Sequence, residues 1–242
     1  MNRQHLSYSD LARIFGIGLI STGIGLLLFV MITVVWGDPF TRVSEQRAQK
    51  KLAADFGNLV GNAPLTTSRL DSRLTRGAAR RYKRSLQSGE VAALLKISSI
   101  GLKKYVVKGA SQADLEKGPG FYDETGMPGS GLPIAIAGHR TTHGAPFLNI
   151  DKIQRGDSIL LDVPYGRFTY RVTRTERITP TDWSILRVGA ATGGRPNAAG
   201  QCPGGTCEHL VLTACHPKYS ARQRLAVFAI LHRVQLRKVG RR

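Results

Sequence analysis

A cysteine and an arginine stand where two predicted strands meet a polar loop. The apolar run over residues 210–214 ends at Cys215, and Pro217 stops the strand because proline has no N–H to donate to a ladder. After the loop, Arg224 begins a second apolar run, which reads as a buried strand over residues 225–231. A thiol beside a guanidinium combines a nucleophile with a group that can stabilise an anion.

A histidine occupies the equivalent place at the end of another predicted strand. The apolar run 132–137 is followed by Gly138 and His139, just as the run before Cys215 is followed by the thiol. A cysteine on its own is more often a buried core residue. The imidazole favours catalysis, because it can be the cation that raises the thiolate fraction or the proton donor to a leaving amine.

These residues are set in a pattern of short β-like runs that are separated by Gly and Pro. Strands are predicted over residues 94–97, 105–107, 134–137, 158–163, 167–173, 209–213 and 225–231. Short helices are predicted over residues 147–153 and from a capping sequence at 179–182. Many short strands joined by turns indicate a closed or nearly closed barrel.

The motifs resemble those of the sortase family, and most closely those of class E sortases of Gram-positive actinobacteria. They are Ala-Gly-His-Arg-Thr-Thr at 137–142, Ala-Pro-Phe at 145–147, Gly-Asp at 156–157, Leu-Thr-Ala-Cys-His-Pro at 212–217, and Arg224. The resemblance covers roughly Ala92 to Leu236. The family usually carries threonine immediately before the cysteine and at the start of that motif, where this chain has Ala214 and Val211.

The resemblance implies a mainly β fold, an eight-stranded sortase barrel with short helices in residues 91–242. In a sortase-like mechanism Cys215 attacks the Thr–Gly carbonyl of a Leu-Pro/Ala-x-Thr-Gly-type sorting signal, with His139 and Arg224 assisting. The thioacyl intermediate passes the surface protein to an amine of a peptidoglycan precursor or a pilin. No cofactor is expected.

Other residues near these motifs are candidates for supporting roles. Candidates for substrate binding flank the cysteine: Thr213, Ala214 and His216. Arg140 and Arg222 compete with Arg224 for the anion-stabilising role, and Arg224 is the one that matches the family position. A zinc site would have to draw on His139, His143, Cys215 and His216. That spacing matches no zinc motif, so no metal is expected.

Two further cysteines lie shortly before the predicted catalytic strand. Cys202 and Cys207 bracket a loop rich in Gly and Pro. A disulfide between them would leave Cys215 free, which a thiol enzyme in an oxidising compartment requires. The alternative is that both are reduced and the loop is flexible, which its glycine content equally permits.

The N-terminal part of the chain reads as a membrane anchor. Residues 14–36 are an uncharged apolar run, long enough to cross a bilayer of about 30 Å at about 1.5 Å per residue. No small-x-small cleavage site precedes Asp38. We expect a cytoplasmic segment (1–13), a single-pass transmembrane helix (14–36), a basic stalk (37–90) and a catalytic domain (91–242). Basic residues flank both ends of the span, so the extracellular placement of the catalytic domain comes from the resemblance.

The charge of the chain favours anionic partners. The formal net charge is +19, from 35 Lys plus Arg and 16 Asp plus Glu, which suits membrane lipid or an acidic wall polymer. The sequence has no nucleic-acid-binding motif, so we expect no nucleic-acid partner.

Other cysteine enzymes of the cell wall and of proteolysis fit the sequence poorly. A papain-like protease needs its cysteine before its histidine, and an L,D-transpeptidase needs Ser-x-Gly before its cysteine; neither pattern is present. The non-catalytic alternative is a membrane-anchored basic module that binds an acidic wall polymer, with Cys215 as an inert core residue.

Overall fold

The computed structural model describes residues 8–36, 39–61, 63–67, 72–187 and 208–237. The chain divides into two compact units, Met1–Pro39 and Phe40–Arg242. The first unit contains α1 (Tyr8–Trp36), in which Ala12–Met31 has a mean hydropathy of 2.3. By length and composition this helix can cross a membrane.

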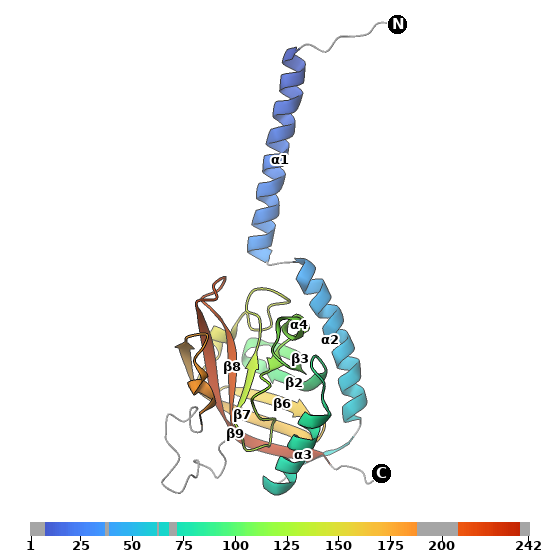
Figure 1. The fold of residues 1–242 in the computed structure, drawn as a ribbon, viewed down its shortest axis with the longest axis vertical. Coiled ribbons are helices and arrows are strands. Elements are labelled where there is room, and N and C mark those ends of the chain that lie inside the picture. The colour runs from blue at the N-terminus through green and yellow to red at the C-terminus, as the bar shows by residue number, and fades with distance from the viewer. Residues whose placement is uncertain (1–7, 37–38, 62, 68–71, 188–207, 238–242) are drawn as a thin grey trace. The chain divides into compact units, whose positions relative to one another are not determined.

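The second unit is built on a closed barrel of eight strands (Figure 1). They are β2 (Val91–Ile97), β3 (Leu102–Lys108), β4 (Gly120–Phe121), β5 (Ile134–Ala137), β6 (Ser158–Val163), β7 (Gly166–Ile178), β8 (His209–His216) and β9 (Gln223–Arg237). The barrel order is β9-β7-β6-β2-β3-β4-β5-β8, and it closes because β8 also pairs with β9. The eight-stranded barrel expected from the sequence is therefore confirmed.

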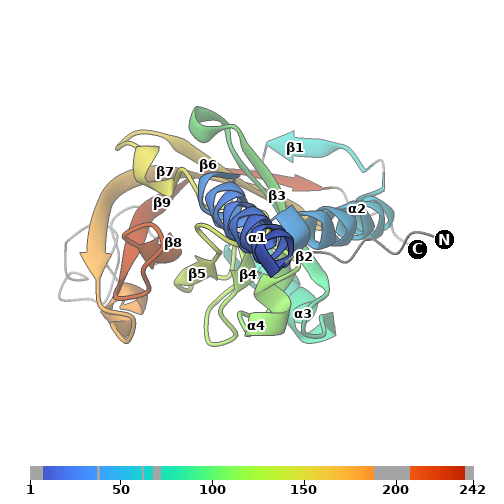
Figure 2. The same ribbon diagram turned by 90° about the horizontal axis from the view of Figure 1, so that it is seen from above.

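Five of the seven predicted strands are longer in the structure, and two short strands were not predicted. Residues 134–137 and 158–163 have the predicted bounds, whereas β7 and β9 are longer than predicted. The two-residue β4 is too short to show any periodicity, so the sequence did not reveal it. The segment expected to be a stalk contains β1 (Leu65–Thr67), which pairs with the last residues of β9 (Figure 2).

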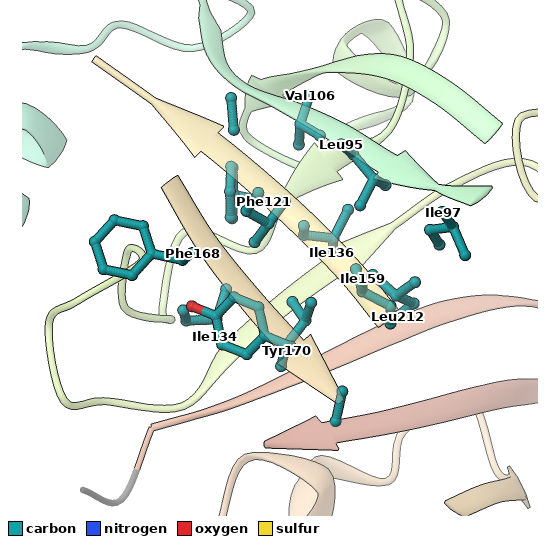
Figure 3. Packing of buried hydrophobic residues seen from close by; sticks show 14 of the residues in the cluster. Leu95, Ile97, Val106, Phe121, Ile134, Ile136, Ile159, Phe168, Tyr170 and Leu212 are labelled. Atoms are coloured by element: carbon teal, nitrogen blue, oxygen red, sulfur yellow. The ribbon is translucent and has the colours of Figure 1, made fainter. Parts of the chain in front are cut away.

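The barrel interior is filled by apolar side chains from every second strand position, as the pleat of a strand dictates. Figure 3 shows Ile134, Ile136 and Leu212 of the parallel strands β5 and β8 beside Phe168 and Tyr170 of β7. All five side chains are fully buried. This core fixes the two strands whose ends carry His139 and Cys215.

Short helical elements differ in how well the sequence indicated them. They are α4 (Gln112–Leu115), η1 (Ser98–Ile100), η2 (Ile150–Lys152) and η3 (Trp183–Leu186). The helix expected over 147–153 is only the 3-10 turn η2. The capping sequence at 179–182 does start a helix, because the Asp182 carboxylate accepts a hydrogen bond from the Ser184 N–H at the beginning of η3.

Much of the segment expected to be a stalk belongs to the second unit. It forms α2 (Pro39–Val60) and α3 (Ser72–Ser85), which lie on the barrel (Figure 1). Leu52 and Phe56 of α2 pack against β2 and β3, and Ala79 of α3 joins the barrel core. Leu52 and Phe56 are four residues apart, so they lie on one face of α2. The many basic residues of both helices obscure this apolar face in the sequence.

Candidate active site

The pairing of three strands brings Cys215, His139 and Arg224 to one end of the barrel. Strand β8 pairs with β9 in an antiparallel register that sets Cys215 directly opposite Arg224. Strand β8 also runs parallel to β5, with Ala137 opposite Thr213. His139 and Cys215 each lie two residues beyond that pair, so they stand at the same end of neighbouring strands.

The cysteine is a free thiol on the outward-facing side of β8. Its side chain is partly exposed, and alternation along the strand puts it on the same face as Thr213. Ala214, a candidate for substrate binding, points the other way and packs into the barrel core with 2% of its surface exposed. A threonine at this position would therefore place its side chain in the core and not beside the thiol.

A small pocket of about 30 Å³ lies on the thiol's side of β8. It is lined by Thr213, Arg224, Tyr122 and Trp183 among others. The Tyr122 hydroxyl is 3.0 Å from the Thr213 Oγ1, and the Tyr122 and Trp183 rings meet edge to face at 6.0 Å. Sequence reasoning missed Tyr122 and Trp183, because neither belongs to a motif that contains the cysteine or the histidine.

Three arginines were candidates for the anion-stabilising role, and the structure separates them. The Arg140 guanidinium is buried and already engaged: Nη2 is 2.9 Å from the Asp151 carboxylate, and Nη1 donates to the His216 Nδ1 at 2.9 Å and to the Cys215 carbonyl at 3.4 Å. Arg222 is exposed in the loop. Arg224 is partly exposed, lines the pocket and donates to the Ala221 and Gln223 carbonyls at 3.0 and 3.1 Å.

Arg140 holds the ends of β5 and β8 together. It follows His139 in the chain, and its guanidinium reaches across to the backbone of Cys215 and the ring of His216. His216, a candidate for substrate binding, thus has its Nδ1 occupied by Arg140. Of the three substrate-binding candidates, only Thr213 faces the pocket.

The His139 imidazole is partly buried from solvent. Its Nε2 is buried and has no hydrogen-bond partner among the described residues. The ring lies over that of His143, with centroids 4.7 Å apart and planes inclined by 31°. Burial is the main cause that lowers the pKa of His139, the charge of His143 lowers it further, and Glu116 raises it.

The loop after His139 is bent tightly around Phe147. The Phe147 N–H donates to the His139 carbonyl at 3.0 Å, and a Cβ at Gly138 would come within 2.6 Å of the Phe147 ring. Glycine is required at position 138 for this approach. His143, Gly144 and Ala145 all have positive φ angles, of 47°, 70° and 45°, so the loop has an unusual backbone where it carries His143.

Other candidates lie outside this constellation. Cys202 and Cys207 fall within residues 188–207, outside the described part of the chain. No group of three or more His, Cys, Asp or Glu side chains among the described residues could hold a metal ion. A larger groove of about 780 Å³ between α2 and α3 is lined by none of Cys215, His139 or Arg224.

Comparison with known proteins identifies the family of this chain. Residues 95–232 match the model of the sortase domain, which is more than half of the chain. The chain belongs to the sortase family. It is 29% identical to Sortase D of Bacillus subtilis (strain 168) over 131 residues, 54% of this chain and 57% of that protein.

The relatives also include class E sortases. Over 227 residues, 90% of this chain, it is 27% identical to Sortase SrtE1 of Streptomyces coelicolor and covers 56% of that protein. The crystal structure of Sortase E1 from Streptomyces coelicolor with a tripeptide in its active site has a TM-score of 0.52 and 28% identity, covering 61% of this chain and 91% of that one. The expected likeness to class E sortases is confirmed, and the chain spans somewhat more than half the length of the first two relatives.

Proposed function

We propose that this chain is a membrane-anchored cysteine transpeptidase that cleaves a C-terminal sorting signal of the Leu-Pro/Ala-x-Thr-Gly type. The observation that carries the proposal is the strand register, which pairs Cys215 with Arg224 and stands His139 at the end of the strand parallel to β8. A nucleophile, an acid–base group and an anion-stabilising donor then share one end of a rigid barrel, as covalent acyl transfer requires.

In the first half-reaction the Cys215 thiolate attacks the carbonyl carbon between Thr and Gly of the signal. A C–S bond forms, and the guanidinium of Arg224 stabilises the oxyanion. The C–N bond then breaks, protonated His139 gives its proton to the departing glycine amine, and the acyl group remains on sulfur as a thioester.

In the second half-reaction an amine of a peptidoglycan precursor or a pilin attacks the thioester carbonyl. His139, now neutral, takes a proton from the amine, and the Cys215 thiolate leaves as the new amide forms. The proton balance closes, because the imidazole gives one proton in the first half and regains one in the second.

Helix α1 suits a single-pass anchor with a cytoplasmic N-terminus and an extracellular catalytic unit. Surface proteins that carry sorting signals, their acceptor amines and membrane lipid are then the partners that we propose. The non-catalytic alternative, an acidic-polymer-binding module with an inert core cysteine, is less well supported, because Cys215 is partly exposed at a strand end.

A transpeptidation assay read by mass spectrometry tests the proposal. Full-length protein in detergent is mixed with a panel of sorting-signal peptides and amines, and we expect a thioacyl adduct on Cys215 followed by an amide product. Cys215→Ala should fold normally and give neither, so a variant that still cleaves at the wild-type rate would overturn the proposal. The same peptides added to intact cells, which they cannot enter, should react only if the catalytic unit lies outside.

A further inference from the structure

Helix α2 is fixed to the barrel and to the active-site loop by polar contacts. The Gln49 amide accepts from the Tyr105 N–H at 2.8 Å and donates to the Tyr105 and Lys117 carbonyls at 3.0 and 2.9 Å. About two helical turns before it, the Thr41 hydroxyl oxygen accepts from the His143 N–H at 3.1 Å. These contacts set the rotation of the helix, and with it the side of α2 that meets the loop.

Glu45 lies between these two attachments and is fully buried, with 0% of its surface exposed. Its Oε1 is 2.5 Å from the Lys104 Nζ. Its Oε2 is buried and has no hydrogen-bond partner among the described residues. A buried carboxylate oxygen without a partner is costly, so its presence calls for an explanation.

The free oxygen of Glu45 points at the loop that carries the histidines. A Cβ placed on Gly144 would come within 2.5 Å of the Glu45 Oε2, which shows how closely the carboxylate approaches the backbone beside His143. Gly144 has φ of 70° and no side chain, so it leaves room for this approach. The carboxylate thus lies against Gly144, the next residue after His143, whose ring packs on that of His139.

Two more buried polar atoms without partners in the described chain lie between the Glu45 carboxylate and the strand end that carries the thiol. The His143 Nδ1 and the His139 Nε2 are both buried without hydrogen-bond partners among the described residues, and their rings lie 4.7 Å apart. Glu45, His143 and His139 therefore form a series of a carboxylate and two imidazoles that ends at the strand end beside Cys215. Buried polar groups without partners are uncommon, and a catalytic role is one explanation for them.

We propose that Glu45 is a positioning residue, whose buried carboxylate holds the His143–His139 pair and favours the protonated form of His139. The inference rests on the proposed acid–base role of His139. It gives α2, the helix that directly follows the membrane-spanning segment in the sequence, a part in the chemistry of the barrel.

The charges around the pair set the sign of the effect. Lys104 offsets the charge of Glu45, Glu116 favours a protonated His139, and His143 opposes it. Replacing Glu45 with glutamine removes the anion next to the His143 loop and leaves the Lys104 cation without its counter-charge. Protonation of His139 then becomes harder, and the pKa of its imidazole falls.

Two other substitutions should act in the opposite direction. His143→Gln removes the neighbouring imidazole that lowers the pKa of His139, so that pKa rises. Lys104→Met removes the cation and leaves the Glu45 carboxylate, so this substitution also raises the pKa of His139. A general loosening of the fold would not produce shifts of opposite sign.

Titration of the His139 ring by NMR tests the proposal without any need for catalysis. Full-length protein in detergent carries Cys215→Ala, and the His139 signal is assigned by its loss in His139→Gln. We expect Glu45→Gln to lower the pKa by roughly 0.5–1 unit and the other two variants to raise it by a similar amount. Asp55→Asn removes an exposed carboxylate from the same helix and should leave the titration unchanged.

The outcomes separate this proposal from the proposed function. A Glu45→Gln titration that coincides with those of wild type and Asp55→Asn overturns the inference. Circular dichroism would reveal whether Glu45→Gln folds. If it does not, an unchanged or lowered pKa of His139 in Lys104→Met overturns the inference instead. Shifts of the expected signs in a protein that transfers no sorting peptide would support the positioning role and contradict only the transpeptidase reading.

Discussion

Two buried glutamates stand at opposite ends of the barrel and differ in how fully their oxygens are bonded. Glu208 precedes β8, whereas Glu45 borders the loop that follows β5; β5 and β8 run parallel, so these are opposite ends. Glu208 is 3% exposed and Glu45 is 0% exposed. Both are buried, but within the described part of the chain Glu208 has donors on both oxygens and Glu45 on only one.

Three donors of the described strands and loops bind the Glu208 carboxylate. Its Oε1 accepts from the Gly129 N–H at 2.9 Å and from the Tyr170 hydroxyl at 2.6 Å, and its Oε2 accepts from the Gly131 N–H at 2.8 Å. These bonds tie the segment before β5 to the start of β8 and to β7. They fix the start of both strands whose far ends carry His139 and Cys215.

The difference in hydrogen bonding suggests that one end of the barrel serves stability and the other serves activity. A fully bonded buried network makes one arrangement rigid and unique. At the opposite end, buried atoms of Glu45, His143 and His139 have no partner in the ranges that the structure describes, so a change of protonation or a bound substrate can use them. Substitutions at one end should therefore lower stability, and those at the other should lower activity.

The largest expected effect is the loss of stability in Glu208→Ala. Removing the carboxylate leaves two backbone N–H groups and the Tyr170 hydroxyl buried without their acceptor, at a cost of about 3–5 kcal/mol. Urea unfolding of a chain that starts at Phe40 measures this cost. A change below about 1 kcal/mol would contradict the stabilising role of Glu208, because its hydrogen bonds would then contribute little to the barrel.

Arg224→Ala should show the reverse pattern. Loss of an oxyanion donor lowers turnover on the order of 10²-fold or more, while the unfolding free energy changes little because the Arg224 side chain is partly exposed. Arg222→Ala is the matched control, an exposed arginine of the neighbouring loop, and should be nearly silent. A severe effect of Arg222→Ala together with a silent Arg224→Ala would move the role to Arg222.

The sequence revealed one of these ends far better than the other. Cys215, His139 and Arg224 stand in local motifs at strand ends, and the parallel and antiparallel pairing of three apolar strands is enough to bring them together. Their positions follow from short-range pattern and strand length. The barrel could be anticipated in the same way from its repeated short strands.

The two glutamates could not be anticipated. Glu45 is one acid in a basic helical segment, and its contacts with Lys104 and the His143 loop join residues that lie 59 or more positions apart. Glu208 meets Gly129 and Gly131 across 79 and 77 positions. No periodicity marks such contacts, because they depend on how α2 and the loops settle on the finished barrel.

The smallest expected effect is in how stability depends on pH. Burial raises the pKa of Glu208 above its usual value, although the Gly129, Tyr170 and Gly131 donors partly offset the rise. Above a pH of about 4.3, where an unfolded glutamate loses its proton, the folded state holds the proton more tightly than the unfolded state. The contribution of Glu208 protonation to the unfolding free energy is complete below that pH and is lost as the pH rises through the folded-state pKa.

Glu208→Gln does not titrate in this range and isolates the effect. The wild-type unfolding free energy should fall relative to that of Glu208→Gln as the pH rises from about 4.3, with a slope of at most about 1.4 kcal/mol per pH unit for one proton. Parallel urea titrations of both proteins at several pH values measure the slope. If instead the unfolding free energy of the wild type rises with pH relative to that of Glu208→Gln, the three donors outweigh burial and hold Glu208 as an anion. Glu208 would then resemble the ion-paired Glu45.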